Sequence, residues 1–148
     1  MIYLATDHRG FELKEKLKAY LQELGHEVTD CGALVLDPND DYTDFVHKAA
    51  QGVAANPDAD KAIVLGASGQ GEAMVANRYK NVRAAVYYGN NADIIRLSRE
   101  HNDANVLSLG AAFLDEETAK SAVKQWLETP FSNGENHVRR ISKIDQLS

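Results

Sequence analysis

Residues 61–76 read KAIVLGASGQGEAMVA, and this stretch decides the fold. The apolar run over 61–65 predicts a buried strand, and the apolar residues that follow predict a helix over 72–79. Between the two, small residues let backbone amides converge on a ligand, and the start of the helix favours negative charge. A strand, a glycine-rich turn and a helix in this order are typical of a parallel sheet that binds ligands at the carboxyl ends of its strands.

The same alternation continues on both sides of this stretch. Short apolar runs predict further strands at 2–6, 27–31, 82–87 and 105–109. Helices are predicted from Glu12 to a terminating Gly25, from Tyr42 to just before Asn56, and over 91–100, 116–127 and 137–147. Near-continuous apolar strands separated by helices imply a sheet covered on both faces. We therefore predict an α/β fold, a three-layer α/β/α sandwich with a five-stranded parallel, Rossmann-like sheet, as a single domain over 1–148.

Composition narrows the class of protein. With 148 residues the chain is long enough to bury a core, and its 44% hydrophobic and 26% charged residues are ordinary for a globular protein. A formal net charge of −6 argues against nucleic acid as a partner, because a phosphate backbone requires a basic face. Cys31 stands alone, which excludes an internal disulfide and indicates a reducing compartment. The apolar start is too short for a signal segment and no run has membrane-spanning length, so we expect a cytoplasmic protein with no membrane partner.

Five short motifs follow one another along the chain. They are DHRGF at 7–11, DY at 41–42, the 66–72 turn followed by AN at 76–77, REHN at 99–102 and HVRR at 137–140. In this order they resemble the successive motifs of the type B ribose-5-phosphate isomerases, a family that also includes galactose-6-phosphate isomerase subunits. The resemblance covers residues 2 to about 144, nearly the whole chain.

The resemblance implies an aldose–ketose isomerase of a phosphorylated sugar that uses neither a metal nor a cofactor. The leading reaction is D-ribose 5-phosphate to D-ribulose 5-phosphate through a cis-enediolate. The resemblance also implies a homodimer or a dimer of dimers with active sites shared between subunits. Two alternatives remain open: isomerisation of another aldose phosphate, such as a hexose or a tetrose, and a non-catalytic sugar-phosphate-binding subunit of the same fold.

Such a reaction requires a base, donors for the developing oxyanion and a group that opens the sugar ring. Glu72 is the predicted base, since the resemblance implies either a Cys at the position of Gly66 or a Glu at the position of Glu72. The alternative is that Glu72 merely suits the helix dipole, which keeps a carboxylate ionised and limits its basicity. Ser68 either relays a proton between sugar oxygens or caps the helix. The rest of the turn is predicted to bind substrate, as an oxyanion hole or a phosphate cradle: Gly66, Ala67, Gly69, Gln70 and Gly71.

The other motifs carry the remaining predicted site residues. His101 is predicted to open the sugar ring, and Asn102 to donate a hydrogen bond to the enediolate; the alternative for His101 is a contact with the last carbonyls of its helix. By resemblance, Asp7 contacts sugar hydroxyls or assists ring opening, although a turn or cap is an equal alternative. His8 is assigned to the phosphate, and Tyr42 is either a wall of the site or part of the core.

Recognition of the phosphate group is where the chain departs from the family pattern. Many relatives carry Arg at the positions of Ala112 and Asn136, where neither residue supplies a guanidinium. Asn136, Arg139 and Arg140 are predicted to contact the substrate, and one of the two arginines could equally belong to a solvated helix face. Either the substrate differs or another basic residue compensates, with Lys143 and Arg83 as candidates. The apolar stripe of this helix covers either its own domain or a neighbouring subunit.

Overall fold

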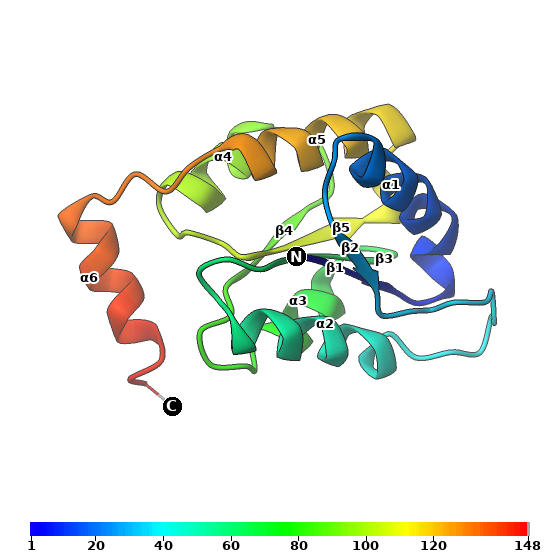
Figure 1. The fold of residues 1–148 in the computed structure, drawn as a ribbon, viewed down its shortest axis with the longest axis horizontal. Coiled ribbons are helices and arrows are strands. Elements are labelled where there is room, and N and C mark those ends of the chain that lie inside the picture. The colour runs from blue at the N-terminus through cyan, green and yellow to red at the C-terminus, as the bar shows by residue number, and fades with distance from the viewer. Residues whose placement is uncertain (148) are drawn as a thin grey trace.

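The computed structural model describes residues 1–147, which form a three-layer α/β/α sandwich (Figure 1). A five-stranded sheet lies in the middle with strand order β2-β1-β3-β5-β4, and every neighbouring pair is parallel. This confirms the predicted fold class. The strands are β1 (Ile2–Thr6), β2 (Val28–Asp30), β3 (Lys61–Gly66), β4 (Ala84–Tyr87) and β5 (Val106–Gly110).

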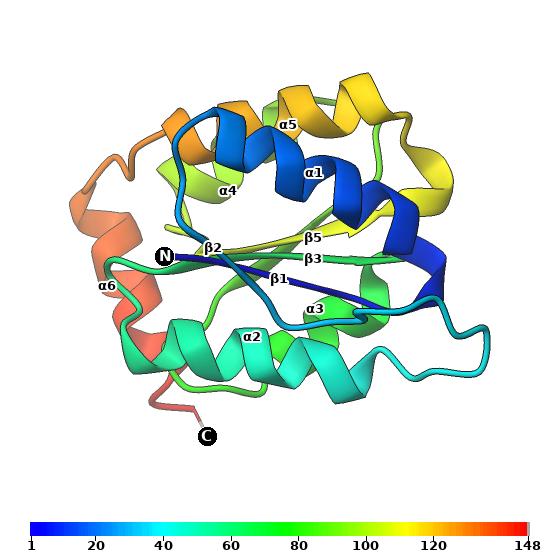
Figure 2. The same ribbon diagram turned by 45° about the vertical axis from the view of Figure 1, so that its right-hand side comes forward.

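Helices cover both faces of the sheet. Figure 2 shows α1 (Phe11–Glu23), α4 (Asp93–Glu100) and α5 (Glu116–Glu128) on one face, and α2 (Thr43–Ala55) and α3 (Gln70–Ala76) on the other. Two short 3₁₀ helices, η1 (His8–Gly10) and η2 (Ala111–Phe113), follow β1 and β5. Within residues 1–147, none of the helices combines the length and the apolar character needed to cross a bilayer.

The core lies in two layers because successive side chains of a strand point to opposite faces of the sheet. In β3, Ile63 and Leu65 belong to the layer that contains the fully buried Trp126 of α5, whereas Val64 packs with small residues of α2 such as Ala49 and Ala50. The residues of β3 from Ala62 onward are all buried, and Lys61 at its start is partly exposed, which explains the continuous apolar run that follows Lys61.

The predicted boundaries between α3 and β4 were wrong. The helix predicted over 72–79 is α3, which ends at Ala76. The side chain of Asn77 pairs with both backbone groups of Ala84: its Oδ1 accepts from the amide at 2.8 Å, and its Nδ2 donates to the carbonyl at 3.2 Å. Asn77 therefore links the end of α3 to the start of β4, which begins at 84 and not at 82.

The last helix also differs from the prediction. It is α6 (Glu135–Ile144) rather than 137–147, so Asn136 lies inside it and Leu147 lies beyond its end. Figure 1 shows α6 standing apart from the sandwich, joined by an extended segment after α5. None of its residues is buried, and its apolar residues Val138 and Ile144 are 48% and 46% exposed. The apolar stripe therefore does not belong to the core of its own chain.

Candidate active site

The carboxyl ends of β1 and β3 lie side by side and bring the first candidate residues together. Thr6, the last residue of β1, pairs with Leu65 of β3, and its hydroxyl donates a buried 2.9 Å hydrogen bond to the Leu65 carbonyl. Asp7 follows β1 directly, and the glycine-rich turn follows β3. The sheet therefore places Asp7 and the glycine-rich turn at the ends of neighbouring strands, as predicted.

Glu72 is buried at this edge, with 4% of its surface exposed. Its carboxylate occupies the space directly over Gly66, so that a Cβ atom at position 66 would collide with it. Burial, and to a smaller extent the nearby charge of Asp7, raises the pKa of Glu72. A backbone hydrogen bond at the start of the helix lowers the pKa of Glu72, as expected, but burial has the larger and opposite effect. A base of raised pKa is better suited to removing a proton from carbon.

The glycine turn is held from β5 and not by Ser68. Gly69 is the N-cap of α3 and has a left-handed conformation with φ 79°, which favours glycine. The Ser108 hydroxyl fixes the turn from β5 by donating a 2.6 Å hydrogen bond to the Gly69 carbonyl. Ser68 is therefore not the N-cap, and its Oγ accepts only a long 3.4 Å bond from the Gln70 amide. The partly exposed Ser68 hydroxyl is available to a ligand.

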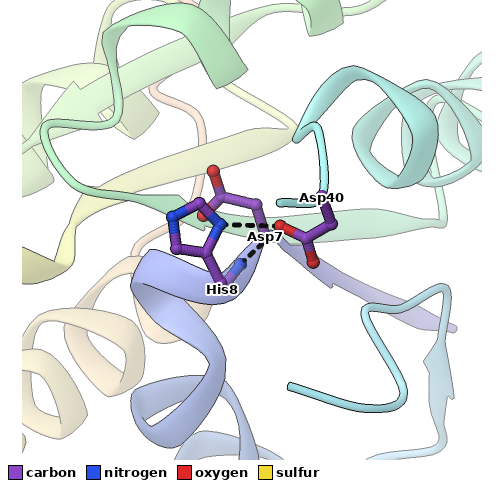
Figure 3. Close-up of side chains that lie close together, drawn as sticks. All are labelled: Asp7, His8 and Asp40. Atoms are coloured by element: carbon purple, nitrogen blue, oxygen red, sulfur yellow. Dashed lines mark hydrogen bonds and ion pairs between the residues drawn. The ribbon is translucent and has the colours of Figure 1, made fainter. Parts of the chain in front are cut away.

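Asp7 and His8 form the other side of the same edge. Asp7 is buried and caps η1 by accepting a 2.9 Å bond from the Arg9 amide, so the capping alternative is correct for one of its oxygens. The His8 ring lies against Asp40 (Figure 3), a residue that sequence reasoning missed. The sequence of the 36–44 loop is polar and acidic, and the position of Asp40 beside the 41–42 motif was the available signal.

Tyr42 lies between the core and the glycine turn. It is partly buried and packs against the core layer under α2. Its ring also lies so close to Gly71 that a Cβ there would approach the ring within 2.6 Å. A glycine at position 71 is thus required by the tyrosine, and the ring borders the turn that carries Glu72.

His101 and Asn102 lie at the opposite end of the sheet. Asn102 follows α4, and its carbonyl accepts a 3.0 Å bond from the Nε of Arg83, the residue immediately before β4. Gly110, at the other end of β5, approaches Ser68. The length of β5 separates these two ends by roughly 13 Å at about 3.3 Å per residue. The predicted site residues therefore form two groups in one chain, not one.

The amino-end group is more exposed and contains basic side chains. The rings of His101 and His137 stack with centroids 4.3 Å apart and an interplanar angle of 16°. Burial of the His137 ring in this stack, followed by the charges of His101 and Arg140, lowers the pKa of His137. Arg139 donates a 2.9 Å bond to the Asn136 side chain on the same helix. Arg83 is engaged by the Asp103 carboxylate at 3.2 Å, which makes it a poor substitute for a phosphate ligand.

The two groups differ in chemistry as well as in place. A buried carboxylate of raised pKa beside a turn of backbone amides, on the carboxyl edge of a parallel sheet, is typical of an α/β enzyme site for proton transfer. Comparison with known proteins places it further: the chain belongs to the ribose/galactose isomerase family, whose model matches residues 2–144.

Individual relatives agree with this assignment. The ribose-5-phosphate isomerase B of Mycolicibacterium paratuberculosis is 39% identical over 140 residues, which is 95% of this chain and 86% of that protein. The structure of ribose-5-phosphate isomerase B from Mycoplasma genitalium with bound ribulose 5-phosphate matches with a TM-score of 0.94 and 36% identity, covering 99% of this chain and 94% of that one. The enzyme from Thermotoga maritima matches with a TM-score of 0.90 and 43% identity, over 98% and 97% of the two chains.

Proposed function

We propose that this chain is an aldose–ketose isomerase that interconverts D-ribose 5-phosphate and D-ribulose 5-phosphate, with Glu72 as its base. The single observation that carries the proposal is the burial of the Glu72 carboxylate against Gly66, which raises its pKa. The names of the relatives and the bound ribulose 5-phosphate in the Mycoplasma genitalium structure support the choice of substrate.

The chemistry follows from one base that serves two adjacent carbons. Glu72 removes the proton from C2 of the open-chain aldose; the C–H electron pair becomes the C1–C2 double bond, and the carbonyl electrons move to O1. The resulting cis-enediolate is stabilised by amides of the Gly69–Gly71 turn, while Ser68 transfers a proton between O1 and O2. Glu72 then returns its proton to C1, which completes the ketose. Gly66, Ala67 and Gln70 complete the wall of the turn.

Ring opening requires the second group of residues, and we assign it to the partner subunit of a symmetric dimer. His101 is exposed and lies far from Glu72 in its own chain. Helix α6 has no buried residue and exposes an apolar face, as expected of an element that packs on another subunit. In a two-fold dimer, the amino end of each chain's sheet meets the carboxyl end of the partner's sheet, so the dimer contains two such contacts. A dimer of dimers repeats them.

Each site then draws on both chains. Asp7, His8 and Tyr42 come from the chain that supplies the base, and His8 contacts the phosphate. The partner supplies His101 for ring opening, Asn102 as a donor to the enediolate, and Asn136, Arg139 and Arg140 toward the phosphate. The single thiol, Cys31, is half-buried with a pKa raised by burial, so it takes no part in the chemistry; a free thiol also suits the reducing cytoplasm in which we place the protein.

Solvent deuterium uptake tests the role of Glu72 directly. The wild type should convert ribose 5-phosphate and exchange the proton at C2 in heavy water. Glu72→Gln should abolish the exchange while substrate still stabilises the protein against heat. Exchange at an undiminished rate in Glu72→Gln would remove Glu72 from the mechanism, and no turnover of any aldose phosphate by the wild type would leave a binding subunit in its place.

The second candidate substrate is another aldose phosphate. It is favoured because positions 112 and 136 hold Ala112 and Asn136 in place of arginine. A panel of tetrose, pentose and hexose phosphates decides between them by kcat/KM. If a tetrose or a hexose phosphate is the better substrate, Asn136→Arg should selectively improve the turnover of ribose 5-phosphate, because a guanidinium adds a charge-assisted contact to the phosphate.

A further inference from the structure

Asp40 is a buried acid at the carboxyl edge to which no role has been given. Its side chain is 8% exposed. Its Oδ1 accepts two hydrogen bonds, both from His8: one from the backbone amide at 2.9 Å and one from ring Nδ1 at 2.7 Å. Its Oδ2 is buried without a hydrogen-bond partner among the described residues. As Figure 3 shows, the Asp40 carboxylate faces the His8 ring, so its charge acts on His8.

A metal site is the first function to consider for this cluster. Asp7, His8 and Asp40 could each offer one ligand atom, and these atoms lie within 4.8 Å of one another. However, these groups are already engaged within the protein: Nδ1 of His8 bonds Asp40 at 2.7 Å, and Asp7 accepts a 2.9 Å bond from the Arg9 amide. The geometry is that of a carboxylate–imidazole pair.

We propose that Asp40 is a positioning residue that holds His8 as a cationic hydrogen-bond donor for the phosphate group of the substrate. Because Nδ1–H is committed to Asp40, ring Nε2 is the atom left for a ligand. In a neutral ring Nε2 would be an acceptor and would repel a phosphate oxygen, whereas in the imidazolium it donates. Asp40, with Asp7 beside it, stabilises that imidazolium. This proposal rests on the proposed function, in which His8 contacts the phosphate.

The position of Asp40 in the chain adds a geometric argument. It lies two residues before Tyr42, whose ring packs against Gly71 in the turn that carries Glu72. The segment 40–42 therefore contacts His8 through Asp40 at one end and the glycine turn through Tyr42 at the other. Through these two contacts it sets the spacing between the proposed phosphate donor and the base, which is the role of a residue that acts through others.

Inorganic phosphate tests the proposal without any need for turnover. Its dissociation constant is measured by calorimetry for the wild type, Asp40→Asn, Asp40→Ala and the matched control Asp37→Asn. Asp37 is an acid in the same loop whose side chain accepts a bond from the Asn39 amide, so its variant removes one charge without touching His8. Asn keeps the size of Asp40 and one acceptor oxygen but loses the charge. We expect Asp40→Asn to weaken phosphate binding and raise the KM for ribose 5-phosphate about tenfold, with kcat little changed and Asp37→Asn like the wild type.

A double-mutant cycle separates action through His8 from a merely structural role. In a His8→Ala background, Asp40→Asn should have almost no further effect on phosphate binding, because the group it acts on is gone. Multiplying effects of the two variants, or wild-type phosphate binding in Asp40→Asn with a defect only in Asp40→Ala, would overturn the proposal. These outcomes concern phosphate binding alone, so they are distinct from a failure of the isomerase assignment, which the wild-type turnover assay detects.

A spectroscopic measurement on the wild type does not depend on the variants folding. The ¹⁵N shifts of the His8 ring in the phosphate-bound protein should show both ring nitrogens protonated. A single protonated nitrogen in that complex would overturn the proposal.

Discussion

The two ends of the parallel sheet hold their polar side chains in different ways. At the carboxyl end, Asp7 and Glu72 are buried, and His8 is fastened by Asp40. At the amino end, His101 and Arg140 are exposed, and α6 contacts little of its own chain. Ionisation of a buried carboxylate whose pKa is raised by burial lowers the free energy of unfolding, and the core of the same chain must offset this loss. An exposed group has no such cost, but it gains a dry, oriented environment only when another subunit covers it.

Refolding two inactive variants together tests this difference and has the largest expected effect. Glu72→Gln damages the carboxyl end and His101→Ala the amino end, so each variant alone should lose about a hundredfold or more in activity. If each site combines the two ends of different chains, a mixed dimer has one intact site and one doubly damaged site. In an equal mixture about half of the dimers are mixed, and about a quarter of the wild-type activity should return.

The controls for this experiment are the two variants refolded separately and then combined on ice, where chains do not exchange. They should stay inactive. A refolded mixture no more active than these controls would contradict the shared site and would require both ends to meet within one chain.

A methyl group at Gly66 should break the carboxyl end alone. A Cβ at this position would collide with the Glu72 carboxylate, and displacing a base by about 1 Å can cost about a hundredfold in rate. We expect Gly66→Ala to lower kcat by about that factor with little change in KM. The matched control is Gly134→Ala at the amino end, where the new Cβ would lie 3.1 Å from the movable His137 ring. Near-wild-type kcat in Gly66→Ala would show that Glu72 acts from another position.

The arginines of α6 provide a smaller effect within the amino end. Arg139 is bonded to Asn136 on its own helix, whereas Arg140 has no hydrogen bond or ion pair among residues 1–147. Arg140→Ala should therefore raise the KM for ribose 5-phosphate about tenfold, as expected for one lost charge-assisted contact, and Arg139→Ala should raise it less. Steady-state kinetics on the two variants gives the comparison. Equal effects would show that both guanidinium groups face the phosphate.

Much of the carboxyl end could be predicted from sequence, because strand periodicity fixes where β1 and β3 end and the motif residues follow at once. Asp7, Ser68 and Glu72 were placed at one edge in this way. What could not be predicted was the balance of forces on Glu72: its position in the first turn suggested that the helix dipole governs it, while burial in fact dominates. Burial depends on side chains from several elements, which no local pattern contains.

The amino end was less predictable for a different reason. His101 could be assigned to the end of a helix, but the edge of the sheet to which it belongs depends on the direction in which α4 crosses back. Asp40 was missed because its partner, His8, lies 32 residues away along the chain. Likewise, the stacking of His101 on His137 joins two motifs far apart in sequence. Long-range contacts between polar residues leave no periodic signal, unlike the contacts of a strand or a helix.

Stability as a function of pH gives the smallest and most specific test of the comparison. Burial and the charge of Asp7 raise the pKa of Glu72, so its ionisation costs more in the folded chain than in the unfolded chain. This cost is absent at a pH below the pKa that Glu72 has in the unfolded chain. It is complete once the pH exceeds the pKa that Glu72 has in the folded chain. Glu72→Gln removes it and should raise the midpoint of thermal unfolding by about 2–4 °C at about pH 8, but hardly at about pH 4. The exposed counterpart, His101→Asn, should show no such gain at alkaline pH. A Glu72→Gln variant less stable than the wild type at about pH 8 would mean that the carboxylate is compensated where it lies, and the two ends would then not differ in energetic cost.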